Sequence, residues 1–292
     1  MKKVYGILLV SCLCFGMASV AGAQEKSGGV MPPPKVLLVN REVLKPGKSG
    51  MTHEKSESAF VKAMVAANSP NHYIALDAIT GPSRSLFLSG YSSFENWEKS
   101  VLADIHNPTL SSALDSAAVT DGDLLQTYES SIYVLREDQS YNTGGGLAHA
   151  RYFEIEVYQV KPGHDADWET IVKMVKPALI KANPDDSWAM YERAYGGEPA
   201  FVVMKAMKSA TEIDRGFADN PKFAAAMGEE GMKKLGDLTA AAIQMSQSNL
   251  FVINPRMSYV GSDMINADPE FWKAASAQQT SGQGNATEKP AQ

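Results

Sequence analysis

Two glutamates lie close together in a pattern that suits acid–base chemistry. Glu154 and Glu156 are separated by one residue inside a segment of alternating character, so both side chains leave a strand on the same face. A carboxylate that is shielded from water has a raised pKa and can accept a proton from a substrate. We therefore predict Glu154 and Glu156 as catalytic residues if the chain is an enzyme. The competing interpretation is a solvated or self-neutralised pair without chemistry.

Aromatic and cationic side chains accompany these glutamates. Tyr152 and Tyr158 share their face of the same segment. Tyr191 and Arg193 share one face of the next predicted strand. If the two rows meet, they enclose a polar and aromatic cavity. We predict that these four side chains bind a ligand there.

Two histidines are further candidates for ligand binding. His53 lies near the start of a predicted helix on its inward stripe, where simple packing is the alternative. His106 precedes an Asn-Pro pair at a predicted helix entry, where N-terminal capping is the alternative. No two histidines show metal-ligand spacing, and both cysteines, Cys12 and Cys14, lie in the N-terminal leader described below. We therefore predict no metal site.

The composition is that of a globular protein and excludes several classes. The 292 residues are 44% hydrophobic and 21% charged, which rules out a collagen-like, coiled-coil or wholly disordered chain. Lys and Arg number 27 against 33 Asp and Glu, and the net charge of −6 argues against a nucleic-acid partner. The P-loop, the dinucleotide-binding glycine motif after a strand and the G-x-S-x-G elbow are missing from the sequence.

The N-terminal residues predict export. Two lysines precede an apolar stretch, and Ala21-Gly22-Ala23 has the small-residue pattern of a cleavage site, so residues 1–23 are predicted to be a signal peptide cleaved after Ala23. An uncleaved anchor and a lipoprotein signal at Cys12 are the alternatives. The expected location is periplasmic or secreted. We expect no membrane attachment after cleavage, because no later run is long and apolar enough to cross a bilayer.

The same pattern occurs twice in the chain, with a period of about 116 residues. Val43-Leu44-Lys45-Pro46-Gly47 matches Gln159-Val160-Lys161-Pro162-Gly163, and Asn107-Pro108 matches Asn220-Pro221. Alternating segments, helical periodicity and turn residues predict the order β-α-β-β-α-β in each copy, which is a ferredoxin-like unit. The predicted strands include 36–44 in the first copy and 152–160, 201–207 and 249–253 in the second. Both Asn-Pro pairs predict a helical region that breaks and restarts there.

The repeats set the predicted domain boundaries. They are a signal peptide at 1–23, a linker at 24–35, ferredoxin-like repeat 1 at 36–137, a Gly-rich linker at 138–149, ferredoxin-like repeat 2 at 150–260 and a C-terminal extension at 261–292, disordered from about 274. The linker assignment rests on three consecutive glycines, and the disordered tail rests on its lack of apolar periodicity.

One face of each predicted sheet remains to be covered once its two helices are in place. In the strand 152–160, we expect the apolar row of Phe153, Ile155 and Val157 to meet the helices and the glutamate row to face the open side. Two open faces can pack together and their edges can pair. This arrangement resembles the dimeric α+β barrel superfamily, which includes antibiotic-biosynthesis monooxygenases, NIPSNAP and EthD-like families and the haem-binding chlorite dismutase group. The resemblance covers about residues 36–258 and carries no signature of one family.

The resemblance implies an α+β fold in which two tandem ferredoxin-like repeats form an intramolecular dimeric α+β barrel, whose interior often holds a ligand or an active site. We predict an exported protein that binds a small molecule in a polar-aromatic barrel cavity. The alternatives are a cofactor-independent oxygenase or isomerase with a cavity carboxylate, and a non-catalytic structural or interaction protein. We predict no cofactor and disfavour haem, because no proximal histidine can be singled out. The oligomeric state is left open.

Overall fold

A computed structural model describes residues 32–273, so the predicted signal peptide and the predicted disordered tail lie outside the described residues. The first half contains β1 (Val36–Leu44), α1 (Met51–Ala67), β2 (Tyr73–Ala78), β3 (Arg84–Tyr91), α2 (Phe94–Ile105), α3 (Pro108–Gly122) and β4 (Leu125–Leu135). The second half contains β5 (Tyr152–Val160), α4 (Asp165–Ala182), β6 (Ala189–Tyr195), β7 (Phe201–Met207), α5 (Thr211–Ala242) and β8 (Ile243–Tyr259), followed by α6 (Ser262–Ala267). Both halves have the predicted element order.

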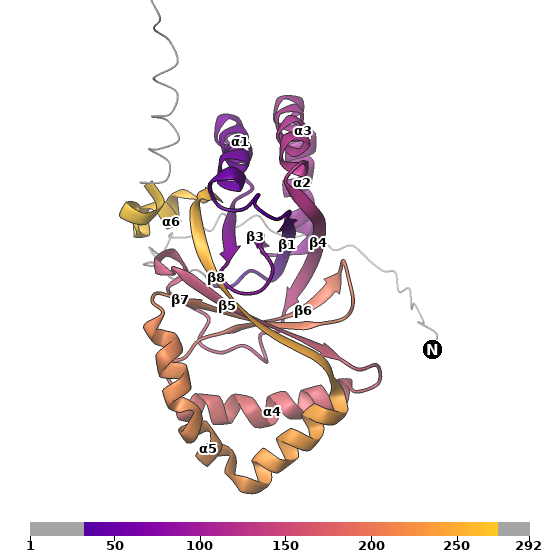
Figure 1. Ribbon diagram of the computed structural model, residues 1–292, viewed down its shortest axis with the longest axis vertical. Coiled ribbons are helices and arrows are strands. Elements are labelled where there is room, and N and C mark those ends of the chain that lie inside the picture. The colour runs from indigo at the N-terminus through magenta and orange to yellow at the C-terminus, as the bar shows by residue number, and fades with distance from the viewer. Residues whose placement is uncertain (1–31, 274–292) are drawn as a thin grey trace, which may run out of the picture.

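The eight strands form one closed antiparallel barrel in the order β1-β3-β2-β8-β5-β7-β6-β4. The two halves meet at two seams, where β2 pairs with β8 and β4 pairs with β6. The last strand of each half thus pairs with the second strand of the other half, and closure leaves no free sheet edge in the barrel. The predicted fold, two ferredoxin-like repeats that form an α+β barrel within one chain, is confirmed (Figure 1).

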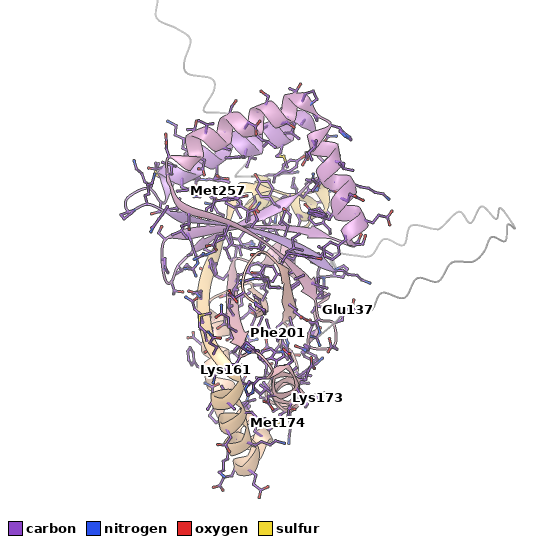
Figure 2. All side chains as sticks on the ribbon, turned by 90° about the vertical axis from the view of Figure 1, so that its right-hand side faces the viewer. Glu137, Lys161, Lys173, Met174, Phe201 and Met257 are labelled. Carbon is purple, nitrogen blue, oxygen red and sulfur yellow. The ribbon has the colours of Figure 1, made fainter. Side chains whose placement is uncertain are left out.

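The helices cover the outside of the barrel at opposite ends of the molecule. Helices α1, α2 and α3 lie over the sheet of the first half, and α4 and α5 lie over the sheet of the second half (Figure 1). Figure 2 shows Phe201 between the strands of the second half and the helix that carries Lys173 and Met174. No helix within residues 32–273 is long and apolar enough to cross a membrane.

The faces of the strands are the reverse of those predicted. Every strand contributes to one apolar cluster inside the barrel, which includes Leu37, Leu76, Leu86, Tyr133, Phe153, Tyr191, Val202 and Phe251. Tyr158 instead lies on the outer face, where it packs with Trp168 of α4 and Phe201 of β7. The apolar row of β5 faces the interior because eight strands converge there and exclude water, whereas helices cover only part of the outer face.

The second helical region breaks as predicted in the first half only. The Asn107 side chain accepts a hydrogen bond from the Leu110 N–H at 3.1 Å, which begins α3 and separates it from α2. In the second half, α5 continues through Pro221 and bends at Gly228, whose φ is 69°. Figure 1 shows α5 as two arms that meet at an angle. The break falls at Gly228 because glycine adopts positive φ at little cost.

The segments beside the second repeat pack onto the barrel. The predicted linker 138–149 contains a short 3₁₀ helix, Leu147–His149. The Trp272 side chain of the C-terminal extension is 2% exposed, and its indole N–H donates to the Ala148 carbonyl at 2.9 Å. Arg151 donates to the Asp268 carboxylate at 2.5 Å. The beginning of the extension therefore belongs to the folded barrel.

Candidate functional site

A pocket of about 530 Å³ opens at one end of the barrel. Its inner wall comes from the interior faces of five strands, through Leu37, Leu88, Phe153, Tyr191 and Met204. The first two of these residues belong to the first half of the chain, and the other three belong to the second half. The pocket therefore exists only when the two halves close the barrel.

The rim of the pocket is built from segments outside the strands. Residues 32–34 and Met264 of α6 also line it. The Tyr191 hydroxyl donates to the Pro34 carbonyl at 3.0 Å and fixes the N-terminal segment there. A Cβ atom at Gly90 would lie 2.7 Å from the Pro34 ring, so glycine is required for this close approach. The mouth of the pocket is thus held in place by specific contacts.

The chemistry of the pocket is mainly apolar and aromatic. Trp188 lines it, and its indole N–H is already used in a hydrogen bond to the Gln139 carbonyl at 2.9 Å. His72 also lines it and stacks on Tyr259 with the ring centres 4.9 Å apart. Burial lowers the pKa of His72, which favours its neutral form. Such a pocket suits an uncharged ligand of apolar or aromatic character.

The predicted catalytic glutamates lie outside this pocket. Glu154 and Glu156 share the outer face of β5 with Tyr158, whose hydroxyl donates to the Glu156 carboxylate at 2.5 Å. Burial, and then the charge of Glu156, raise the pKa of Glu154, which the neighbouring Lys205 partly opposes. The prediction that this row lines the cavity with Tyr191 and Arg193 was wrong, because the two rows lie on opposite faces of the sheet.

The other predicted ligand-binding residues are dispersed. Tyr152 and Tyr158 follow the alternation of β5 onto its outer face. Arg193 points inward but is held by the Tyr133 hydroxyl, to which it donates twice at 2.8 and 3.0 Å. His106 is exposed at the end of α2. Tyr191 is the predicted residue that lines the pocket.

His53 lies at the centre of a second site, a buried cluster of four side chains between the sheet and the helices of the first half. The cluster comprises Glu42 of β1, His53 and Glu57 of α1, and Asp121 of α3. The His53 Nε2 atom lies 2.9 Å from Glu42 Oε2, 3.8 Å from Glu57 Oε1 and 3.7 Å from Asp121 Oδ1. All four residues are at most 6% exposed. We call this set the first-half cluster.

The electrostatics of the first-half cluster disfavour three negative charges at once. Burial raises the pKa of Glu42, although the hydrogen bond with His53 partly opposes this. The pKa of Glu57 lies well above its ordinary value because of burial and the charges of Glu42 and Asp121. Within residues 32–273, His53 is the side chain that lies within ion-pair distance of all three carboxylates. The cluster must therefore hold protons or a cation.

Sequence reasoning singled out His53 but missed its three partners. His53 and Glu57 have the i, i+4 spacing that places two side chains on one helix face, and this signal was present in the sequence. Glu42 and Asp121 come from other elements, and only the fold brings them to the same place.

Comparisons with known proteins give likenesses in structure. No protein-family model matches the chain, and no curated protein matches it in sequence. The solved structure of an anthrone oxidase-like protein has 13% identity and a TM-score of 0.51, over 77% of this chain and 94% of that one. A protein assigned as a monooxygenase from Fusobacterium nucleatum has 12% identity and a TM-score of 0.46, over 76% of this chain and 94% of that one. Chlorite dismutase from Candidatus Nitrospira defluvii has 10% identity and a TM-score of 0.44, over 83% of this chain and 95% of that one.

The likeness to the anthrone oxidase-like structure and the closed eight-stranded sheet show the fold, a dimeric α+β barrel formed within one chain. The resemblance drawn from the duplication is confirmed at this level. No specific family within the superfamily is assigned.

The prediction of no cofactor, with haem disfavoured, is corrected by the buried cluster around His53. It rested on the spacing of histidines in the sequence, whereas the fold places one buried histidine among three carboxylates. Sequence spacing was a poor guide here because the donors come from three separate elements.

Proposed function

We propose that this protein binds an uncharged, apolar or aromatic small molecule in the pocket at the end of the barrel. The single observation that carries the proposal is the pocket of about 530 Å³, which is walled by apolar side chains from both halves. Its volume lies in the range of pockets that bury most of a drug-sized ligand. The ligand class differs from the polar-aromatic cavity that the sequence suggested, because the glutamate row lies on the outer face.

The experiment is a titration with the uncharged fluorescent probe N-phenyl-1-naphthylamine. Leu88→Trp places a large ring in the pocket wall and should weaken binding at least tenfold, which corresponds to about 1.4 kcal/mol. Ala206→Leu, at another lining position, is a milder filling variant. Val65→Trp is the control, because Val65 is 60% exposed on α1. Unchanged binding by both folded filling variants would refute the proposal.

A second candidate function is an enzyme that acts on such a ligand, and the observation that favours it is His72 in the pocket wall. A neutral imidazole can accept a proton from a bound substrate. For a ligand bound in this pocket, His72 is the group within reach, because Glu154 and Glu156 lie on the outer face of β5. With a panel of aromatic substrates, turnover that His72→Ala abolishes without weakening probe binding would support catalysis, and turnover by this variant at the normal rate would exclude this role.

We also propose that the protein is exported to the periplasm or secreted, with cleavage after Ala23. The support is the pattern of the first 23 residues. N-terminal sequencing of the protein recovered from the exported fraction should begin at Gln24. A chain that starts at Met1, or a lipid attached to Cys12, would contradict this cleavage.

A further inference from the structure

We propose that the first-half cluster of Glu42, His53, Glu57 and Asp121 is a binding site for one divalent first-row transition-metal ion. One imidazole nitrogen and three carboxylates form the donor set. Imidazole suits zinc and iron, and carboxylate suits manganese, so the mixed set fits Mn²⁺, Fe²⁺ or Zn²⁺ better than Ca²⁺. This site is separate from the pocket, because none of the four residues lines it.

The distances within the cluster match those around a single ion. Donor atoms that each lie about 2.1 Å from a central ion are separated by at most about 4.2 Å. The three separations from His53 Nε2, 2.9, 3.7 and 3.8 Å, lie below this limit. All four donor atoms lie within 4.8 Å of one another, so a small contraction closes the set around an ion.

Two carboxylate oxygens that would bind the ion have no hydrogen-bond partner within the described structure. They are Glu57 Oε1 and Asp121 Oδ1, and they belong to side chains that are 3% and 2% exposed. Both atoms face His53 Nε2 within 4 Å. A buried oxygen without a partner costs about 1–3 kcal/mol, and more when it is charged. A cation at the centre of the cluster would satisfy both oxygens at once.

The surroundings of His53 hold its ring in the orientation of a metal ligand. The His53 Nδ1 atom lies 3.4 Å from Ser85 Oγ, and the Ser85 hydroxyl donates to Asp77 at 2.5 Å. The Asn254 amide donates to the other Asp77 oxygen at 2.8 Å. Metal-ligating histidines commonly donate their second ring N–H to a neighbouring polar group in this way, which leaves Nε2 free to face the ion.

The second half of the chain shows that the fold does not need polar residues at this place. Glu42 pairs with Ser85 between β1 and β3, in the same way as Tyr158 pairs with Phe201 between β5 and β7. Trp168 of α4 stacks on Phe201 with the ring centres 4.6 Å apart, so three aromatic side chains fill the equivalent space. Packing alone therefore does not account for the charged set in the first half.

Shared protons are the competing explanation for the cluster. A proton between the carboxyl groups of Glu57 and Asp121 would also relieve their repulsion. With His53 neutral, three ionised carboxylates carry a charge of about −3, and one divalent ion would reduce it to about −1. The two explanations differ in whether the protein binds an added metal stoichiometrically.

The test uses the full chain after treatment with a chelator and dialysis, followed by equilibrium dialysis against MnCl₂ or ZnCl₂ with elemental analysis. We expect one ion per chain. The isosteric variants Glu57→Gln and Asp121→Asn should bind at least tenfold more weakly, because each loses a charged ligand. Glu156→Gln, which removes a carboxylate on the outer face of the second half, should bind within twofold of the wild type. Circular dichroism checks that each variant is folded.

Three results would overturn the proposal. They are no stoichiometric binding of either ion, binding that both ligand variants retain, and binding of Ca²⁺ in preference to Mn²⁺ and Zn²⁺. The first would assign the cluster to shared protons. For Mn²⁺, electron paramagnetic resonance gives an independent readout, because the signal of the free hexaaqua ion should disappear with one equivalent of protein. The Leu88→Trp variant should retain the metal, which separates this test from that of the pocket.

Discussion

Tyr191 is the residue through which the barrel interior and the N-terminal segment are joined. Its side chain is 2% exposed, and its hydroxyl donates to the Pro34 carbonyl at the mouth of the pocket. Tyr191→Phe should lower the free energy of unfolding by about 1 kcal/mol, because a buried hydrogen bond is lost. Tyr195→Phe is the matched control on the same strand, where Tyr195 is 64% exposed. Urea unfolding that gives equal stabilities for the two variants would contradict this contact.

At the residue scale, the sequence was enough to predict which side chains share one face of a strand. Tyr191 lines the pocket, and its role in ligand binding remains a prediction. Glu154 and Glu156 were placed correctly on one face of one strand but on the wrong side of the sheet, and their catalytic role remains a prediction. Alternation shows which side chains share a face, but it does not show which face the barrel encloses.

At the scale of elements, the bend in α5 depends on one glycine. Gly228 has a φ of 69°, which strains any residue with a side chain, and open space surrounds it. Gly228→Ala should therefore destabilise the protein by about 1 kcal/mol. Gly236→Ala in the same helix should stabilise it by about 0.5–1 kcal/mol, because alanine is the better helix former at an ordinary helical position. Thermal unfolding compares the stabilities of the two variants. Stabilisation by both changes would mean that α5 is not bent at Gly228.

The attachment of the C-terminal extension depends on Asp268. The hydrogen bond from Arg151 holds the pKa of this carboxyl below its ordinary value of 3.8. A depressed carboxyl pKa stabilises the fold above about pH 3.8, and this contribution is lost as the pH falls through the lower folded value. Asp268→Asn should thus cost up to about 1 kcal/mol at pH 7.

The same variant gives the sign of the pH effect. The difference in unfolding free energy between the wild type and Asp268→Asn should shrink at pH 3 or below, because the wild-type carboxyl is then becoming protonated. Urea unfolding at pH 7 and at low pH measures it. A difference that is as large at low pH as at pH 7 would show that the carboxylate charge does not hold the extension.

Strand boundaries were predicted well where the alternate residues on one face of the strand were apolar. They were predicted poorly where neither face was apolar. The strands β1, β5 and β7 have the predicted ends. The strand β8 runs from Ile243 to Tyr259, whereas the sequence predicted only 249–253. Its first residues pair with β5 but carry exposed polar side chains, so no hydrophobic alternation marks them. The long-range pairing defines this part of the strand.

At the scale of the whole molecule, the duplication was enough to predict the barrel but not its lining. In an isolated ferredoxin-like unit, the apolar row would meet the helices, and this led to the wrong assignment of Phe153 and Ile155. Closure adds a second buried space, and the apolar row occupies it. The helix side of the first half then contains the charged cluster at His53, and of its four members the sequence placed only His53 on an inward face.

The seams between the halves can be tested with a disulfide. Val134 of β4 and Glu192 of β6 are paired across one seam. With Cys12 and Cys14 replaced by serine, the double variant Val134→Cys and Glu192→Cys should form a disulfide within one chain, because neighbouring strands bring the two Cα atoms close enough. Mass spectrometry of the oxidised protein should give the monomer mass. A disulfide-linked dimer would instead mean that two chains complete the barrel.

The measurement that tests the ligand-binding account most directly is a crystal structure of the protein with N-phenyl-1-naphthylamine. The account predicts one probe molecule inside the barrel, in contact with Leu37, Phe153 and Tyr191. Probe found only on the outer surface, with an interior filled by the side chains of the protein, would contradict it.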